Sequence, residues 1–294
     1  MGLDVYSRRE YKQGKFVYLL DDEEKTAWIA KGHIGRCRRY RLPDHVMVDG
    51  ERYTVESVEI GAYNCPKTLQ HLVILDSIRY VDEDVFFRLK NLRSLYIGKG
   101  VKYWSSWHFR FCPKLDSFNI DKDSPFLKYE NGMVLSKDGK IVFACRIDRP
   151  QVVIPDGVEE ISNVAFWYFN KLETIVFPKS LRRIGDNSFS NIPNLRCVVL
   201  PEGFEDCVVQ SFMDDVNLTH IDLPSTFTDL GTETFVGCSN LKTIILRSSI
   251  VANGFRAFDE PTTTCCLYVP SELVEKYRQD PYWSMFPNIL PIEQ

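Results

Sequence analysis

Apolar side chains recur along the chain with a period of 23 residues. Apolar residues followed by proline stand at Ile154, Phe177, Leu200 and Leu223, and Val269-Pro270 follows two periods later. An aromatic column keeps the same step at Tyr63, Phe86, Phe109, Phe166, Phe189, Phe212, Phe235 and Phe258. A leucine column follows it at Leu69, Leu92, Leu115, Leu172, Leu195, Leu218 and Leu241. Columns that stay in phase over this length predict a stack of similar units rather than one globular core.

Each repeat unit ends in an alternating apolar segment, of which Ile175-Val176-Phe177 is an example. Alternation places every second side chain on one face, so the segment is expected to be a strand that pairs with its counterpart one period away. A coil this short cannot bury its own apolar side, and only neighbouring coils can cover it. The sequence therefore predicts a mainly β repeat solenoid with a parallel sheet on one face.

Departures from the period indicate the domain organisation. Ile120 and Ile154 are 34 residues apart instead of 23, and the turn pairs Asn131-Gly132 and Asp138-Gly139 divide short apolar runs between them. The expected parts are an N-terminal β-hairpin cap at 1–50, three repeats at 51–120, an enlarged unit with an inserted β-meander at 121–154, five repeats at 155–269 and a short helical C-terminal cap at 270–294. Runs 15–20 and 26–30 form the hairpin.

In the C-terminal cap, Ser271 is expected to cap a helix over 272–277. Tyr282, Trp283 and Phe286 are expected to close the last coil.

The composition is that of a folded chain without a general affinity for nucleic acid or membranes. Hydrophobic residues make up 44% and charged residues 26%, which is too apolar for disorder. A net charge of -4 gives no drive towards nucleic acid, and no apolar run is long enough for a membrane helix. The first twenty residues lack the basic start and apolar run of an export signal. As written, the sequence predicts no nucleic-acid partner, no membrane insertion and a cytoplasmic location.

No constellation for catalysis or metal binding stands out. The five histidines lie outside metal and nucleophile motifs, and the nine cysteines form no CxxC pair. We expect no enzymatic activity, no cofactor, no metal and free, mostly buried thiols. His71 and His220 share one repeat position that is expected to face outward. Asn217-Leu218-Thr219 matches a glycosylation sequon, but Asn217, like Asn194 and Asn240, recurs with the repeat and is interpreted as a turn residue.

Two charged segments have a functional and a structural interpretation each. The basic run Arg36–Arg41 contains an aromatic residue, as nucleic-acid patches often do, but a solvated cap edge that discourages sheet-to-sheet pairing is favoured. On a strand its arginines are expected to divide between both faces. Between Arg196 and Lys242 no Lys or Arg occurs, and an acidic band at 202–233 either selects a basic partner or keeps the array in solution.

The outward strand position supplies a candidate partner surface. It reads Val73, Tyr96, Asn119, Val176, Val199, Asp222, Ile245 and Tyr268, and all of these except Asn119 form the candidate surface. Most are apolar or aromatic although the pleat points them to solvent, which favours a protein-binding face; the alternative is that other parts of the coil cover them. A carbohydrate-binding surface protein is the second hypothesis, with Tyr96, Tyr103, Trp104 and Trp107 as candidates, although Trp104 occupies a core column.

The units resemble the BspA-like class of leucine-rich repeats. The resemblance rests on Leu172–Pro178, Leu181–Gly185, Ala165-Phe166 and Phe235–Leu241, and it covers about residues 51–290. It implies a right-handed leucine-rich-repeat coil and a bacterial or protist protein for interaction or adhesion, with no shared catalytic residues. It also implies a protein partner such as a host or cell-surface ligand, and a cell-surface or secreted location if a leader was removed.

Overall fold

The predicted mainly β repeat solenoid is confirmed. The computed structural model describes residues 8–32, 35–59, 67–86, 89–110, 112–207, 209–249, 256–259 and 264–293. The chain forms two compact units, Met1–Lys137 and Asp138–Gln294. Their boundary lies within the predicted enlarged unit. The finer division of the chain into five parts stays a prediction.

The first unit begins with a cap sheet. Its strands are β1 (Arg9–Gln13), β2 (Phe16–Asp21), β3 (Thr26–Gly32), β5 (His45–Val48), β6 (Glu51–Val58) and β8 (Tyr80–Val81). The expected hairpin is β2–β3, which is antiparallel, and β6 lies parallel to β3. The apolar interior of this sheet contains the buried side chains of Leu20, Trp28 and Val55.

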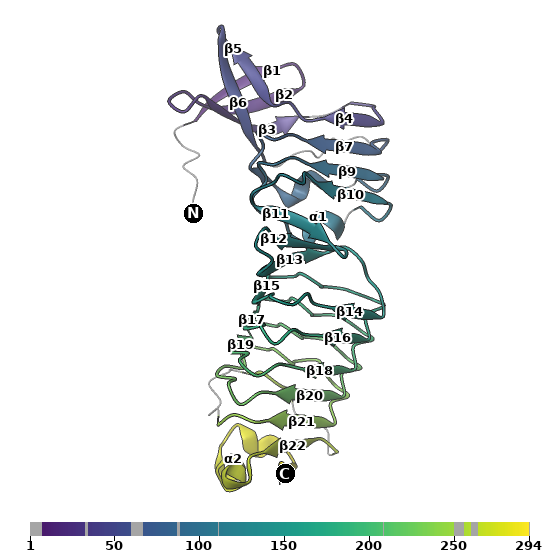
Figure 1. Cartoon of the computed structure of the whole chain (residues 1–294), viewed down its shortest axis with the longest axis vertical. Coiled ribbons are helices and arrows are strands. Elements are labelled where there is room, and N and C mark those ends of the chain that lie inside the picture. Colours follow the sequence, from purple (N-terminus) through teal and green to yellow (C-terminus); the bar gives the residue numbers. More distant parts are fainter. Residues whose placement is uncertain are drawn as a thin grey trace. The chain divides into compact units, whose positions relative to one another are not determined.

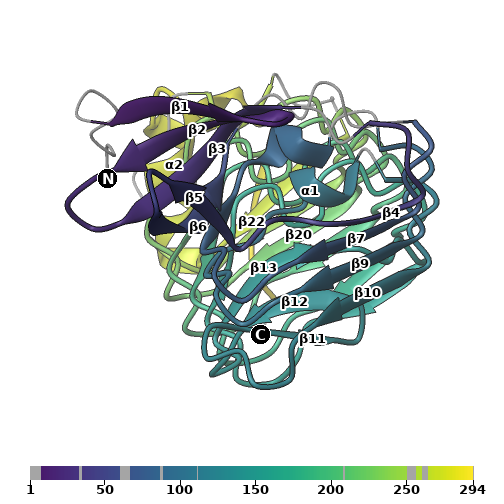
Figure 2. The same ribbon diagram turned by 90° about the horizontal axis from the view of Figure 1, so that it is seen from above.

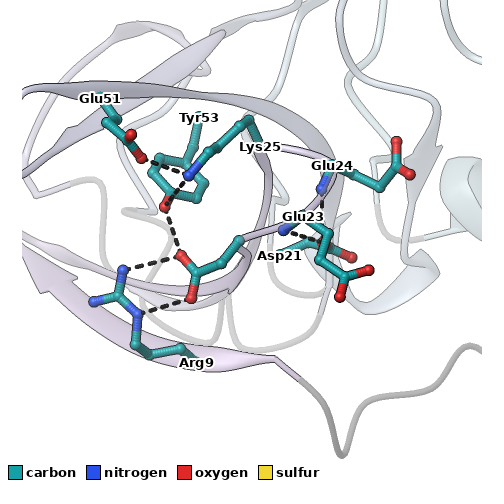
Figure 3. Close-up of polar contacts among 8 residues, drawn as sticks. Arg9, Asp21, Glu23, Glu24, Lys25, Glu51 and Tyr53 are labelled. Carbon is teal, nitrogen blue, oxygen red and sulfur yellow. Dashed lines mark hydrogen bonds and ion pairs between the residues drawn. The ribbon is translucent and has the colours of Figure 1, made fainter.

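A polar network ties the tip of the β2–β3 hairpin to neighbouring strands (Figure 3). Asp22 accepts hydrogen bonds from the Arg9 guanidinium at 3.2 and 3.1 Å and from the Tyr53 hydroxyl at 2.5 Å. Lys25 donates to Glu51 at 2.5 Å and to the Tyr53 hydroxyl at 3.3 Å. The Arg9 and Tyr53 hydrogen bonds lower the pKa of Asp22 to about 2. The Asp22 carboxylate therefore stays ionised at more acidic pH than an unpaired aspartate does.

The repeat strands of the first unit stack in parallel, one per coil (Figures 1 and 2). They are β4 (Arg39–Arg41), β7 (His71–Ile74), β9 (Ser94–Ile97) and β10 (Ser117–Ile120), in that order. The first strand, β4, comes from the basic run that was expected to belong to the cap alone. Between the repeat strands the chain forms the short helices η3 (Glu83–Phe86) and α1 (Trp107–Arg110). The hairpin of β11 (Leu127–Glu130) and β12 (Met133–Ser136) follows, with its turn at Asn131-Gly132 as predicted.

The second unit contains two parallel sheets. The wide one runs through β14 (Gln151–Val153), β16 (Thr174–Val176), β18 (Cys197–Val199), β20 (His220–Leu223), β21 (Thr243–Leu246), β22 (Cys266–Val269) and β23 (Asn288–Pro291). The narrow one contains β13 (Ile141–Cys145), β15 (Glu160–Ile161), β17 (Arg183–Ile184) and β19 (Asp206–Cys207). The sequence predicted only the wide sheet, because two-residue strands are too short to show an alternating pattern.

The aromatic column forms a continuous stack inside the second unit. Neighbouring rings from Phe166 through Phe189, Phe212 and Phe235 to Phe258 have centroids 4.8, 5.4, 5.5 and 5.1 Å apart, and their planes are within 12° of parallel. All five are buried, as are the leucines of the next column. These placements confirm the predicted register.

Among the described residues, four members of the predicted columns are less buried than expected, and half-buried Ile120 is one of them. Ile175 and Phe177 were expected to point inward, but both are only half-buried, at a coil where β16 and β18 share a single ladder pair. Phe109 is also half-buried, and Tyr63 lies outside the described residues.

Polar contacts also repeat from coil to coil. The side chains of Asn194, Asn217 and Asn240 donate to backbone carbonyls of the preceding coil at 2.6 to 2.7 Å. Their interpretation as turn residues was therefore incomplete, because they join neighbouring coils.

Each coil of the second unit also turns through a left-handed residue. Val164, Asn187, Gln210, Glu233 and Arg256 have φ between 52° and 58°. Of these, Val164, Asn187 and Gln210 donate their N–H groups to carbonyls of the next coil. Because side chains as different as Val and Gln adopt this conformation, the stack rather than the local sequence imposes it.

The C-terminal cap closes the ring stack as predicted. Trp283 and Phe286 are buried, and their ring centroids lie 6.2 and 5.6 Å from that of Phe258. The helix was placed wrongly in detail: Ser271–Leu273 is a 3-10 turn, and α2 spans Val274–Gln279. Ser271 makes no capping bond because its hydroxyl donates to the Glu272 carboxylate at 3.2 Å. A second 3-10 turn at Trp283–Met285 and strand β23 complete the cap.

We predict that Phe212→Ala lowers the free energy of unfolding by about 3–5 kcal/mol, because it leaves a cavity between two stacked rings in a fully buried position. Chemical denaturation monitored by circular dichroism measures this loss. Phe126→Ala, at a partly exposed ring outside the stack, is the control with a smaller expected effect. A loss below about 1 kcal/mol at Phe212 contradicts the importance assigned to the ring stack.

Candidate functional site

The outward face of the wide sheet carries two columns of side chains in the second unit. One column is largely polar and contains Gln151, Thr174, Cys197, His220, Thr243, Cys266 and Asn288. The other is largely apolar and contains Val153, Val176, Val199, Asp222, Ile245, Tyr268 and Leu290. The ladder register brings members of each column from successive coils next to one another, although β16 and β18 pair only at Thr174 and Cys197. The result is a regular apolar stripe beside a polar one.

The apolar column differs in exposure along its length. Val153, Val176 and Val199 expose 52%, 46% and 52% of their surface, so the coil does not cover them. Ile245 and Tyr268 are half-buried, and they pack in part against their neighbours. The exposed part of the stripe thus lies on strands β14, β16 and β18, with Leu290 on β23 exposed as well.

Asp222 is the charged member of the apolar column, and Arg247 neutralises it. The guanidinium of Arg247 donates to the two carboxylate oxygens at 2.9 and 2.8 Å. A bidentate pair of this geometry holds both side chains in place and leaves little net charge on the face. The contact raises the pKa of Arg247 further.

The outward face of the first unit is more polar. The Tyr96 hydroxyl donates to Asp121 at 2.6 Å, which raises the pKa of Tyr96 to about 12 and lowers that of Asp121. Val73 is half-buried, and Asn119 is exposed. The Tyr96 hydroxyl is therefore already hydrogen-bonded within the chain, which the sequence did not predict.

At the β4 end of this face lies a shallow hollow of about 440 Å³ lined by Arg39, Tyr40, Arg41, His71 and Val73. The expected division of the arginines between two faces is wrong for the strand itself. Arg39 and Arg41 are two residues apart, so they share the outward face with His71 and Val73.

The aromatic candidates for carbohydrate binding do not form one exposed row. Trp104 is fully buried, with its ring 5.5 Å from that of Phe86, as its place in a core column suggested. Tyr96 and Tyr103 are exposed, and Trp107 is half-buried beneath the guanidinium of Arg110 at 4.9 Å.

His108 is a buried residue that sequence reasoning passed over. Its ring stacks on that of Trp104 with centroids 4.2 Å apart. Nδ1 accepts a hydrogen bond from the Ser105 N–H at 3.0 Å, so Nε2 carries the proton and donates to the Val81 carbonyl at 3.0 Å. Burial lowers the pKa of His108. A neutral ring with both nitrogens occupied has a structural role, and its contact with Val81 comes from another coil that no local motif shows.

The acidic band at 202–233 is not one continuous surface. Glu202, Glu205 and Asp229 are exposed, while Asp206, Asp214, Asp222 and Glu233 are half-buried. Asp215 is fully buried at a core position, where Cys238 stands one period later. Its Oδ1 accepts a hydrogen bond from the Ile192 N–H at 2.7 Å, and its buried Oδ2 has no hydrogen-bond partner among the described residues. Burial raises the pKa of Asp215 well above its usual range.

The remaining candidate groups fit structural roles. None of the eight described cysteines forms a disulfide with another described residue, and five of them are buried. His71 and His220 are half-buried members of the outward polar columns. In the described part of the chain, no cluster of three His, Cys, Asp or Glu side chains has the geometry to bind a metal ion. Over the same ranges, no helix has the length and apolar character needed to cross a membrane.

Comparison with known proteins identifies similar sequences and folds. A family model for the BspA type leucine rich repeat region matches residues 53–130 and 139–265, in six copies. The fold is similar to that of the pneumococcal vaccine antigen PcpA, with a TM-score of 0.59 and 14% identity over 97% of this chain and 99% of that one. It is also similar to a leucine-rich repeat protein from Bacteroides ovatus, with a TM-score of 0.55 and 16% identity over 96% and 76%. No curated protein matched the sequence.

We predict that Asp215→Asn makes the protein more stable at neutral pH. Because the pKa of Asp215 is raised, the folded chain keeps the carboxyl proton at pH values where the unfolded chain loses it. The protonated carboxyl therefore contributes its full share to folded-state stability below about pH 4, and this contribution is lost as the pH rises through the pKa of the folded state. The titratable groups that face Asp215 are Asp214 and Cys238. An amide keeps the acceptor for Ile192 and cannot ionise.

Melting temperatures of both proteins measured between about pH 4 and 8 check this prediction. The melting temperature of Asp215→Asn should exceed that of the parent by a margin that increases as the pH rises. Asp214→Asn, at the half-buried neighbour, is the matched control and should change the profile less. A constant gap, or a variant that is less stable at every pH, contradicts the assignment.

Proposed function

The chain belongs to the BspA-type leucine-rich-repeat family, and from this premise we propose that it is a non-catalytic protein-interaction module. Its contact surface is the outward face of the repeat sheets. In the second unit this surface is the outward column of Val153, Val176, Val199, Asp222, Ile245 and Tyr268, in which the three valines are the most exposed. In the first unit it includes Val73 and Tyr96.

The exposed valines of that column carry the proposal. Val153, Val176 and Val199 lie on successive parallel strands and keep about half of their surface in contact with water. Strands stack roughly 4.8 Å apart, so the three side chains form one apolar strip rather than isolated spots. A contiguous exposed apolar patch rimmed by polar residues is typical of an interaction site. Because the ladder fixes these side chains, a partner binds them without much ordering cost.

A role in adhesion is the finer part of the proposal. The similar fold of a pneumococcal vaccine antigen supports a cell-surface or secreted protein whose partner is a host or cell-surface protein. The absence of catalysis is inferred from the family, whose repeats build surfaces rather than reaction centres. The aromatic residues of the carbohydrate-binding alternative do not form one exposed row, because Trp104 is buried and the Tyr96 hydroxyl is hydrogen-bonded to Asp121.

We predict that the double variant Val176→Asp and Val199→Asp loses partner binding but keeps its fold, because neither side chain contributes to the buried core. The matched control is Val209→Asp with Val216→Asp, which changes two valines of similar exposure away from the wide sheet. Immobilised parent protein and both variants are compared for the proteins they retain from a cell-surface extract, with mass spectrometry as the readout. Melting curves verify that each variant is folded.

Loss of a specific retained protein by the sheet variant but not by the control is the expected result. Equal retention by both variants, or equal loss, removes the sheet face from the contact. Unfolding of the sheet variant alone means that the valines are part of the packing.

A further inference from the structure

Strand β4 leaves one edge of the first unit's repeat sheet open. It is the end strand in the order β10-β9-β7-β4, and Figure 1 shows it as the last strand of that ladder. The Arg38 carbonyl accepts from the N–H groups of Gln70 and His71, and the Leu42 N–H donates to the Val73 carbonyl. Even-numbered residues therefore direct their backbone groups towards β7. Because backbone direction alternates along a strand, those of Arg39 and Arg41 point to the open edge.

The backbone groups at this edge have no partner within the described chain. No hydrogen bond to the N–H or C=O of Arg39 or Arg41 occurs among the described residues. An unpaired strand edge is a template on which another extended segment can add. Two residues with four free backbone groups are enough to align a short strand beside β4.

The same edge has a concentrated positive charge. Arg36, Arg38, Arg39 and Arg41 are all exposed, and none of them forms an ion pair with a described residue. Other exposed arginines of this unit do have carboxylate partners, as at Arg79, 3.2 Å from Glu56, and Arg93, 3.2 Å from Asp116. The side chains of Arg39 and Arg41 stand on the outward face beside the hollow over His71 and Val73. Residues 1–137 hold 23 basic and 19 acidic side chains, so this unit is positively charged as a whole.

We propose that the open edge of β4 binds an acidic, extended segment of a partner protein as an additional strand. Main-chain hydrogen bonds to Arg39 and Arg41 align the segment, and carboxylates at alternate positions of the segment pair with the two guanidinium groups. Alternation is required because only every second side chain of the added strand lies on the outward face. This site goes beyond the proposed function, since it uses the edge of the sheet and its charge rather than the apolar face.

The geometry favours a peptide over other anions. Free N–H and C=O groups in alternation match another polypeptide backbone, whereas a phosphate chain offers acceptors only. A second copy of the chain is a poor partner at this edge, because two β4 strands side by side would bring their arginines together. The arginines thus discourage self-pairing and select a strand of opposite charge.

The test uses a short synthetic peptide that alternates glutamate with valine, labelled for fluorescence anisotropy, and the full chain. The peptide should bind, and methylation of its backbone nitrogens should reduce affinity at least about tenfold, since methylation removes strand pairing without changing charge. A peptide of the same composition with its glutamates in one block should also bind more weakly. The double variant Arg39→Ser and Arg41→Ser should lose binding, while Arg39→Lys with Arg41→Lys should retain part of it.

The matched control is Arg52→Ser, an exposed arginine on β6 away from this edge, which should bind as the parent does. Equal binding of the methylated and unmethylated peptides overturns strand addition and leaves only charge attraction. Tighter binding of a single-stranded oligonucleotide than of the peptide assigns the arginines to nucleic acid instead. No binding of either probe also overturns the proposal. The double variant Val176→Asp and Val199→Asp should bind the peptide normally, so failure at the edge is distinguishable from failure of the proposed sheet-face contact.

Discussion

The stacking of one coil on the next is the interaction on which the rest of this structure depends. A single coil cannot enclose a core, so nearly every buried group has its partner about one period away. The phenylalanine rings stack in this way, the asparagine side chains donate to the preceding coil, and the left-handed corners donate to the following one. Each of these contacts joins two adjacent coils, and the same contacts recur from coil to coil. Each coil therefore stabilises the coils next to it. The caps are needed because the first and last coils have a neighbour on one side only.

Stacking also separates the positions that hold the fold from those that are free to bind. Inward columns are restricted to side chains that fit between two coils, and an exception such as Asp215 leaves a buried oxygen without a partner among the described residues. Outward columns face no such restriction, because the valines of β14, β16 and β18 and the arginines of β4 are exposed and lie outside the core. The fold thus presents a rigid, ordered surface whose chemistry is set by residues that contribute little to stability. An apolar strip and a basic edge are two surfaces of this kind, each within its own compact unit.

The sequence predicted the repeat, the wide sheet and the ring stack, because a period of 23 residues is visible whenever large apolar residues occupy a column. It did not predict the narrow sheet, whose two-residue strands such as Arg183–Ile184 show no alternation. Strand β4 was missed as a repeat strand because Tyr40 is its single inward residue, and arginines surround it. The roles of His108 and Asp215 depend on contacts with other coils, which no local pattern contains. For the candidate surface, alternation gave the direction of each side chain, but its exposure depends on the size of its neighbours, so Val199 is open and Ile245 is not.

The central claim is that coils are interchangeable units held by contacts one period apart, and deletion of one whole coil tests it most directly. Removal of residues 179–201 joins Pro178 to Glu202 and reproduces the natural junction of Pro201 with Glu202. The shortened protein should melt cooperatively with the β-sheet circular dichroism of the parent, because Phe166 then stacks on Phe212. Removal of residues 179–190, about half a period, should abolish the cooperative transition because every later column moves out of phase. If the two deletions are equally stable, or if the whole-coil deletion unfolds while the half-coil deletion does not, the stacking account is contradicted.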